Sequence, residues 1–193
     1  MNHRRGILVL AAAAIVIFGL SAWRIANPRQ RVIVDPTGIE DRRPAPSFKL
    51  HNQDSKLVPL DLYLDRHRVV LVFFDGTAGP EANGVLTELR DFHEALKREG
   101  VVVFGVSAEL PQNIRRSLTQ PMPFELLSDV KAADPDSVHR RWGCLREPSD
   151  GQPAGTIPAV FLIDRSGLVA WKGDRPLPLA DTSNLVTDLL SGR

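Results

Sequence analysis

Cys144 is the one cysteine in the 193-residue chain, and its thiol is the strongest nucleophile that the sequence offers. A single sulfur excludes an internal disulfide, a cysteine-rich zinc site and a two-cysteine redox pair within one chain. The flanking Trp142 and Leu145 are apolar, which favours a buried cysteine that packs as a small hydrophobic side chain. An exposed reactive thiol, an intermolecular disulfide and a catalytic thiol stay open, because three nearby arginines would stabilise a thiolate if they faced it: Arg140, Arg141 and Arg146.

The other polar residues do not form a pattern typical of a metal or nucleotide site. Four of the five histidines are scattered through the chain after residue 50, without the spacing that places two imidazoles on one helix face: His51, His67, His93 and His139. The segment 105–109 lacks the final glycine of a hydrolase nucleophile elbow. Gly76 and Gly79 are not followed by the Lys-Ser/Thr pair of a phosphate loop. We therefore expect no metal and no cofactor.

Composition and charge indicate an ordinary folded domain. Hydrophobic residues make up 43% of the chain and charged residues 24%, as in typical globular proteins. The length suits one domain with an appendage. The formal net charge of +1 does not indicate the basic surface of a nucleic-acid-binding protein, so we expect no nucleic-acid partner.

An apolar segment without charges occupies residues 6–23, between Arg5 and Arg24. As a helix it would span about 27 Å, close to the hydrocarbon thickness of a bilayer. A cleaved signal peptide is the alternative, but the segment lacks a good small-x-small cleavage site. The flanking charges do not decide the orientation. By analogy with other short amino-terminal anchors, we expect a single-pass membrane anchor in residues 1–23, a linker in 24–43, and a folded domain in 44–193 on the extracytoplasmic, periplasmic side.

Two continuous apolar runs predict strands that are buried on both faces, at residues 69–74 and 101–106. Between them, the apolar residues of 81–99 recur at helical spacing on one stripe: Val85, Leu89, Phe92 and Leu96. Pro80 suits the first turn of this helix. A strand, a helix and a strand in this order predict a right-handed βαβ unit with parallel strands.

The second half of the chain has the pattern of a hairpin. Residues 159–163 and 168–171 are apolar runs joined by a short turn at 164–167, which predicts two antiparallel strands. Further expected elements are short helices at 111–118 and 135–142, a closing helix at 182–190, and an edge hairpin formed by 47–50 and 56–62. The order predicts an α/β fold whose central sheet is mixed, parallel in its first half and antiparallel in its second.

This order and several short strings resemble the thioredoxin-like superfamily, in particular its redoxin domains of the alkyl hydroperoxide reductase/thiol-specific antioxidant type. The strings lie between residues 44 and 190 and comprise Ala45–Phe48, Leu60–Leu62, the strand and loop of Val69–Glu81, and Thr156–Asp164. The loop is similar to the active loop of membrane-anchored extracytoplasmic thioredoxins. The resemblance implies a three-layer fold with helices on both faces of the sheet, and a cis peptide bond before Pro158.

The loop departs from the family pattern at its reactive positions. Where those thioredoxins carry Trp-Cys-Gly-Pro-Cys, this chain carries Thr77–Glu81, with Ala78 and Glu81 at the cysteine positions. Neither side chain is a thiol, and Glu81 is interpreted as a favourable acid at a helix start. The resemblance implies that a peptide-binding groove remains beside this loop, with six binding residues: Thr77, Gly79, Pro80, Glu81, Ile157 and Pro158.

We therefore hypothesise a binding or scaffolding module that lacks thiol–disulfide activity and catalytic residues and holds a client polypeptide near the degenerate loop. The alternative is a thiol oxidoreductase or peroxidase of the same family that uses Cys144.

Overall fold

The computed structural model describes residues 43–149, 154–173 and 186–187. The predicted membrane anchor lies outside the described residues, as does the linker except for Arg43. Among the described helices, none combines the length and the hydropathy that crossing a membrane requires. The anchor and the location of the domain therefore stay predictions.

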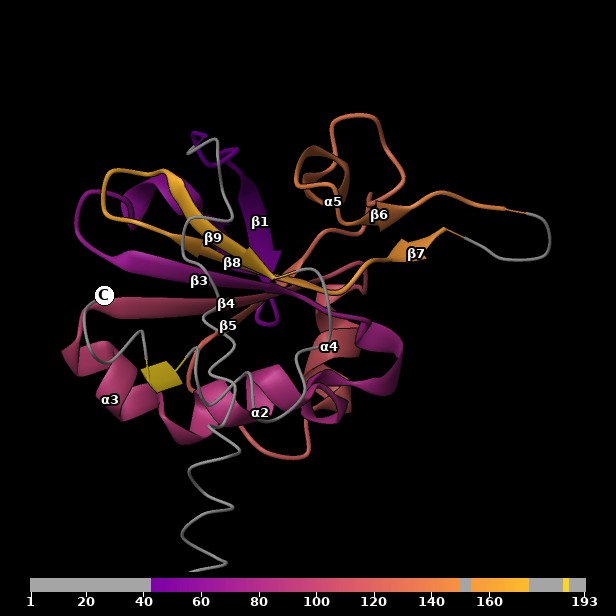
Figure 1. Ribbon diagram of the computed structural model, residues 1–193. Coiled ribbons are helices and arrows are strands. Elements are labelled where there is room, and N and C mark those ends of the chain that lie inside the picture. Colours follow the sequence, from indigo (N-terminus) through magenta and orange to yellow (C-terminus); the bar gives the residue numbers. More distant parts are fainter. Residues whose placement is uncertain (1–42, 150–153, 174–185, 188–193) are drawn as a thin grey trace, which may run out of the picture. The chain divides into compact units, whose positions relative to one another are not determined.

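Within the described residues, seven strands form one sheet in the order β2-β1-β5-β4-β3-β8-β9. Their bounds are β1 (Lys49–Asn52), β2 (Leu57–Pro59), β3 (Arg68–Phe73), β4 (Val101–Ser107), β5 (Glu125–Ser128), β8 (Ala159–Ile163) and β9 (Val169–Gly173). A separate two-stranded ladder pairs β6 (Leu145–Arg146) with β7 (Gly155–Thr156). Figure 1 shows this ladder beside the seven-stranded sheet.

The sheet is mixed, as the sequence predicts. Strand β4 runs parallel to both β3 and β5, whereas β8 is antiparallel to β3 and to β9. The predicted edge hairpin is also present, since β1 pairs antiparallel with β2. Strand β3 consists almost entirely of buried residues, because a central strand of an α/β sheet is covered on both faces.

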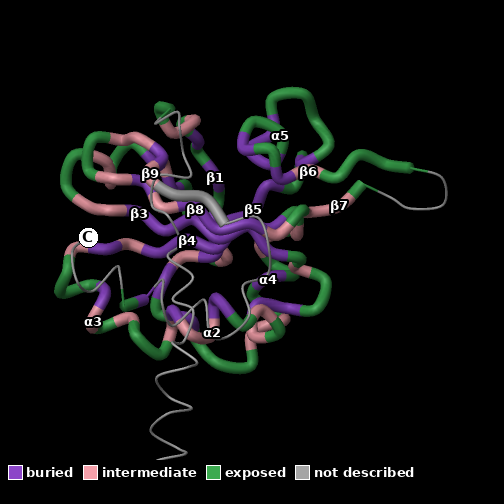
Figure 2. Tube along the Cα trace, viewed as in Figure 1, coloured by how far each residue is buried: buried purple, intermediate pink, exposed green. Residues whose placement is uncertain are grey.

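Helices cover both faces of the sheet, which makes three layers (Figures 1 and 2). On one face lie α2 (Gly84–Asp91), α3 (His93–Arg98) and α4 (Pro111–Ser117), whose apolar residues pack on side chains of β3 and β4. On the other face, residues of α5 (Val138–Arg141) and the following turn pack with β1 and β8. Short 3-10 helices complete the described elements: η1 (Leu60–Leu62), η2 (Gly76–Ala78) and η3 (Pro80–Ala82).

The single helix predicted over 81–99 is wrong in its start and its continuity. Pro80 opens the 3-10 helix η3, and α2 begins only at Gly84, because the Asn83 side chain accepts a hydrogen bond from Leu86 N at 3.0 Å. An asparagine is a favoured amino cap. The backbone then leaves the helical region at Phe92, with ψ near 6°, before α3 begins. This interruption leaves the Phe92 side chain 43% exposed instead of buried on the stripe.

Three strands were not predicted from the sequence. Strand β5 has four residues and sits in a proline-rich segment, and β6 and β7 have two residues each. Strands this short carry too little periodicity to be recognised. Of the predicted closing helix, only Val186 and Thr187 belong to the described residues, and both are helical.

Candidate functional site

The loop that follows β3 is organised by Asp75. Its Oδ1 accepts hydrogen bonds from the backbone N of Thr77 at 3.0 Å and from Thr77 Oγ1 at 2.8 Å. Gly79 follows with a φ of 82°, a left-handed conformation that side chains with a Cβ rarely adopt. Ala78 lies in η2 and brings no reactive group to this loop. The loop therefore has a turn held by the Asp75 carboxylate and by the conformation of Gly79, and it contains no sulfur atom.

Glu81 does not act as the starting acid of α2, as the sequence predicted, because α2 begins at Gly84. Its Oε1 instead accepts from Thr119 N at 2.8 Å, from Thr119 Oγ1 at 3.1 Å and from Gln120 N at 3.2 Å. Partial burial raises the pKa of Glu81, but these hydrogen bonds to the carboxylate outweigh it and hold the pKa below its ordinary value of 4.5. Glu81 thus ties η3 to the segment after α4.

Glu81→Gln is expected to lower the free energy of unfolding by roughly 0.5–1 kcal/mol near neutral pH, a small effect because the site is largely solvated. The folded state has the lower pKa, so the carboxylate stabilises the fold above the ordinary value of 4.5. That contribution is lost as pH falls through the native pKa. Urea unfolding over this pH range should show wild type and variant converging at acid pH. Glu94→Gln is the exposed control, and its difference from wild type in the free energy of unfolding should change less with pH. If the free energies of unfolding of wild type and Glu81→Gln ran parallel over this pH range, the hydrogen-bonding role of the Glu81 carboxylate would be contradicted.

Ile157 and Pro158 lie at the end of β8 that adjoins the loop after β3, because Phe73 pairs with Ala159. The structure therefore brings the two halves of the predicted binding set to one end of the sheet. The predicted cis bond before Pro158 is wrong, since no peptide bond in the described residues is cis. Ile157 N donates to Cys144 O at 2.7 Å, which continues the β6–β7 pairing up to Pro158 and keeps the entering chain extended.

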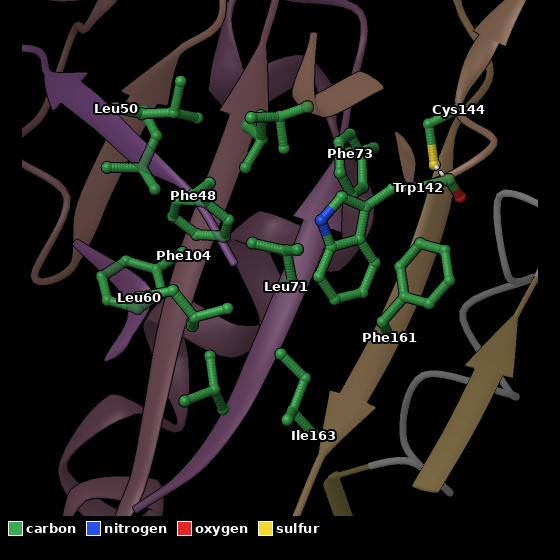
Figure 3. Close-up of a cluster of buried hydrophobic side chains, with 14 of the residues drawn as sticks. Phe48, Leu50, Leu60, Leu71, Phe73, Phe104, Trp142, Cys144, Phe161 and Ile163 are labelled. Carbon is green, nitrogen blue, oxygen red and sulfur yellow. Dashed lines mark hydrogen bonds between the residues drawn. The ribbon is translucent and has the colours of Figure 1, made fainter. Parts of the chain in front are cut away.

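Cys144 is at the same end of the sheet, directly beside Ile157, but its side chain has 0% exposure. Its Sγ donates to Trp142 O at 3.6 Å, and the backbone N donates to His139 O at 2.7 Å. Figure 3 shows the sulfur at the end of an aromatic cluster that contains Trp142 and Phe161. In this closed arrangement the thiol is a packed core group, as its apolar sequence neighbours predict.

A buried polar network, which the sequence does not reveal, lies next to Cys144. Asp129 Oδ2 accepts from His139 N and contacts His139 Nδ1, both at 2.8 Å. His139 Nε2 contacts Thr156 Oγ1 at 3.1 Å. The order carboxylate, imidazole, hydroxyl is that of an activated nucleophile in acyl-transfer enzymes. Here the imidazole has 0% exposure, so in this arrangement it serves to hold β7 against α5. No spacing motif links positions 129, 139 and 156.

One family model and several curated proteins are similar to this chain. The family model described as AhpC/TSA family matches residues 42–172. Chloroplastic peroxiredoxin Q of Oryza sativa subsp. japonica is 27% identical over 163 residues, 79% of this chain and 70% of that protein. Peroxiredoxin Bcp of Escherichia coli is 31% identical over 128 residues, 65% of this chain and 79% of that protein.

Among solved structures, that of peroxidoxin BcpB from Mycobacterium tuberculosis is similar, with a TM-score of 0.67 and 17% sequence identity. The similarity covers 78% of this chain and 95% of that chain. The likeness confirms the predicted thioredoxin-like α/β fold with a mixed sheet.

These relatives contradict the hypothesis of a scaffold without thiol activity, because the curated proteins that the chain resembles are named as peroxiredoxins. They favour the alternative, a peroxidase of the redoxin family. The error in the hypothesis has a chemical origin. Loss of two cysteines from the loop after β3 removes an internal disulfide exchange, but peroxide reduction requires only one thiol when another molecule supplies the reductant.

Proposed function

Because the chain belongs to the AhpC/TSA family, we propose that it is a one-cysteine thiol peroxidase and that Cys144 is the thiol that reacts with hydroperoxides. The observation that carries the proposal is the combination of peroxiredoxin relatives with a single cysteine in the whole chain. The position of Cys144 beside Ile157, at the end of the sheet that also bears the loop after β3, supports it.

The reaction needs a hydroperoxide as oxidant and two equivalents of an external thiol as reductant. The sulfur of Cys144 attacks one peroxide oxygen, the O–O bond breaks, and the other oxygen leaves as an alcohol, or as water from hydrogen peroxide, after taking a proton. Cys144 is then a sulfenic acid. A first external thiol forms a mixed disulfide with it and releases water, and a second thiol breaks that disulfide and restores Cys144. The net change is one peroxide reduced and two thiols oxidised to a disulfide.

Peroxide must reach a sulfur that is covered in the closed structure. We propose that the β6–β7 ladder covers it, because Cys144 directly precedes β6 and its carbonyl accepts from Ile157 N, directly after β7. This ladder pairs Leu145 with Thr156 and Arg146 with Gly155 outside the seven-stranded sheet. A ladder of two residues in each strand can open locally at a small fraction of the free energy of global unfolding. We therefore propose that turnover proceeds through a transiently opened β6–β7 ladder and is slow compared with that of an exposed thiol.

Replacement of the sulfur tests the proposal. The full chain should oxidise an external thiol in proportion to the hydrogen peroxide consumed, and Cys144→Ser should lose all protein-dependent turnover. A sulfenic-acid trapping reagent should add once per chain, at Cys144, as measured by mass spectrometry. His93→Gln, on α3 and remote from the ladder, is the matched control and should keep the wild-type rate. Equal turnover in wild type and Cys144→Ser, or none in wild type, would refute the proposal.

The membrane anchor predicted over residues 1–23, the extracytoplasmic location and a polypeptide partner stay predictions from the sequence.

A further inference from the structure

We propose that the network of Asp129, His139 and Thr156 is a positioning device that holds the β6–β7 ladder closed over Cys144 and thereby determines how often the thiol meets its substrate. The inference rests on the proposed function for its biological meaning, but the geometry and the test concern only the accessibility of the sulfur.

The first link of the network orients the imidazole. Asp129 Oδ2 accepts a hydrogen bond from the backbone N–H of His139 and lies 2.8 Å from Nδ1 of the same residue. The Asp129 and His139 side chains are 6% and 0% exposed. Because a carboxylate only accepts hydrogen bonds, the contact assigns a proton to Nδ1. In the neutral ring, Nε2 is then an acceptor that points away from Asp129.

The second link connects that acceptor to the ladder. Thr156 Oγ1 lies 3.1 Å from Nε2 and can donate its hydroxyl proton there. Thr156 is the residue of β7 that pairs with Leu145, and Leu145 follows Cys144 directly. The next residue, Ile157, donates its N–H to Cys144 O at 2.7 Å. The hydroxyl of Thr156 is thus a side-chain contact between β7 and α5 at the level of Cys144, in addition to the exposed ion pair of Arg140 in α5 with Glu147 after β6.

Loss of this hydroxyl acts differently on the closed and the opened ladder. In the closed state, Thr156→Val would leave the buried Nε2 of His139 without a hydrogen-bond donor. A buried acceptor without a partner destabilises the closed state enough to shift the opening equilibrium of the ladder about tenfold. In the opened state, water can reach the imidazole and replace the lost partner. The substitution therefore raises the opened fraction about tenfold, and a thiol that reacts only when opened should react faster by the same factor.

Alkylation of Cys144 in the native full chain tests the device. We expect iodoacetamide to modify wild type slowly, Thr156→Val about tenfold faster, and Thr156→Ser at close to the wild-type rate, because serine retains the hydroxyl. Intact-mass measurement gives the rates, and urea unfolding of each variant gives the global stability. Thr87→Val is the matched control, since Thr87 makes its hydrogen bond to Gly84 O in α2, away from the ladder. It should leave the alkylation rate within about twofold of wild type.

Hydrogen exchange supplies a second measurement that needs no variant. If one local opening exposes both the amide of Ile157 and the thiol of Cys144, the same opening equilibrium should limit hydrogen exchange of the amide and alkylation of the thiol. The proposal is overturned if Thr156→Val alkylates no faster than wild type, or if Ile157 exchanges only by global unfolding. It is also overturned if the rate of Cys144 alkylation in native wild type, relative to that in the urea-unfolded chain, gives an opening free energy equal to the free energy of global unfolding. Failure of the peroxidase proposal would appear instead as absent peroxide turnover, with these alkylation rates unchanged.

Discussion

Replacement of Asp129 with alanine is expected to lower the free energy of unfolding by about 3 kcal/mol. The carboxylate is the acceptor for both the backbone N–H and Nδ1 of His139. Its removal leaves two donors unpaired in a region with almost no exposed surface, and each buried donor without a partner costs about 1–3 kcal/mol. Asp129→Asn retains one carbonyl oxygen in the same place and should lose about half as much.

Urea unfolding followed by circular dichroism measures both variants. The matched control is Asp91→Ala, because Asp91 is exposed and pairs only with the neighbouring Arg90 among the contacts of the described residues. Its expected change is within about 0.5 kcal/mol. If Asp129→Ala lowers the free energy of unfolding no more than Asp91→Ala does, His139 finds other acceptors. The proposal that Asp129 orients the His139 imidazole would then be wrong.

Replacement of Trp142 with alanine should destabilise the fold by about 3–5 kcal/mol, the usual cost of a large cavity in a packed core. Trp142 is fully buried, and its ring centre lies 4.9 Å from that of Phe161 and 6.1 Å from that of Phe73. Figure 3 shows the indole within this cluster. Cys144 packs in the same cluster, so the cavity should also loosen the covering of its sulfur.

Trp142→Phe should cost far less, within about 1 kcal/mol of wild type, because two effects oppose each other. The smaller ring leaves part of the volume empty, which destabilises the fold. However, the indole Nε1 is buried without a hydrogen-bond partner among the described residues, and its removal relieves a cost of about 1–3 kcal/mol. Thermal unfolding compares the variants, with Phe92→Ala as an exposed aromatic control. Equal losses in Trp142→Phe and Trp142→Ala would mean that Nε1 is satisfied in solution.

The elements that form the sheet core could be predicted because their pattern is local. The apolar runs at 69–74 and 101–106 became β3 and β4, parallel as expected, and residues 159–173 formed the expected antiparallel pair β8 and β9. In β3 and β4, nearly continuous burial leaves a run of branched and aromatic residues that can be identified from neighbouring residues alone. The family followed from short strings in the same order.

The site residues could be placed only in part. The sequence identified Cys144 as the one thiol and brought Ile157 and Pro158 into consideration, but it assigned Glu81 to the start of a helix. In the structure Glu81 binds backbone N–H groups 38 and 39 residues further along the chain. A side chain's partner at such a separation depends on how the loops close, and no local periodicity contains that information.

By itself, the sequence determined every strand of the central sheet except β5, the mixed order of their pairing and the presence of a single thiol, because these follow from local residue patterns and from the order of the segments. The redoxin family followed from the resemblance of short strings to that family. Only the tertiary structure decided that this thiol is covered and that Asp129, His139 and Thr156 meet behind it. Three residues separated by 10 and 17 positions come together only when β5, α5 and β7 are packed, since burial and hydrogen bonding between separate segments arise from the closed fold.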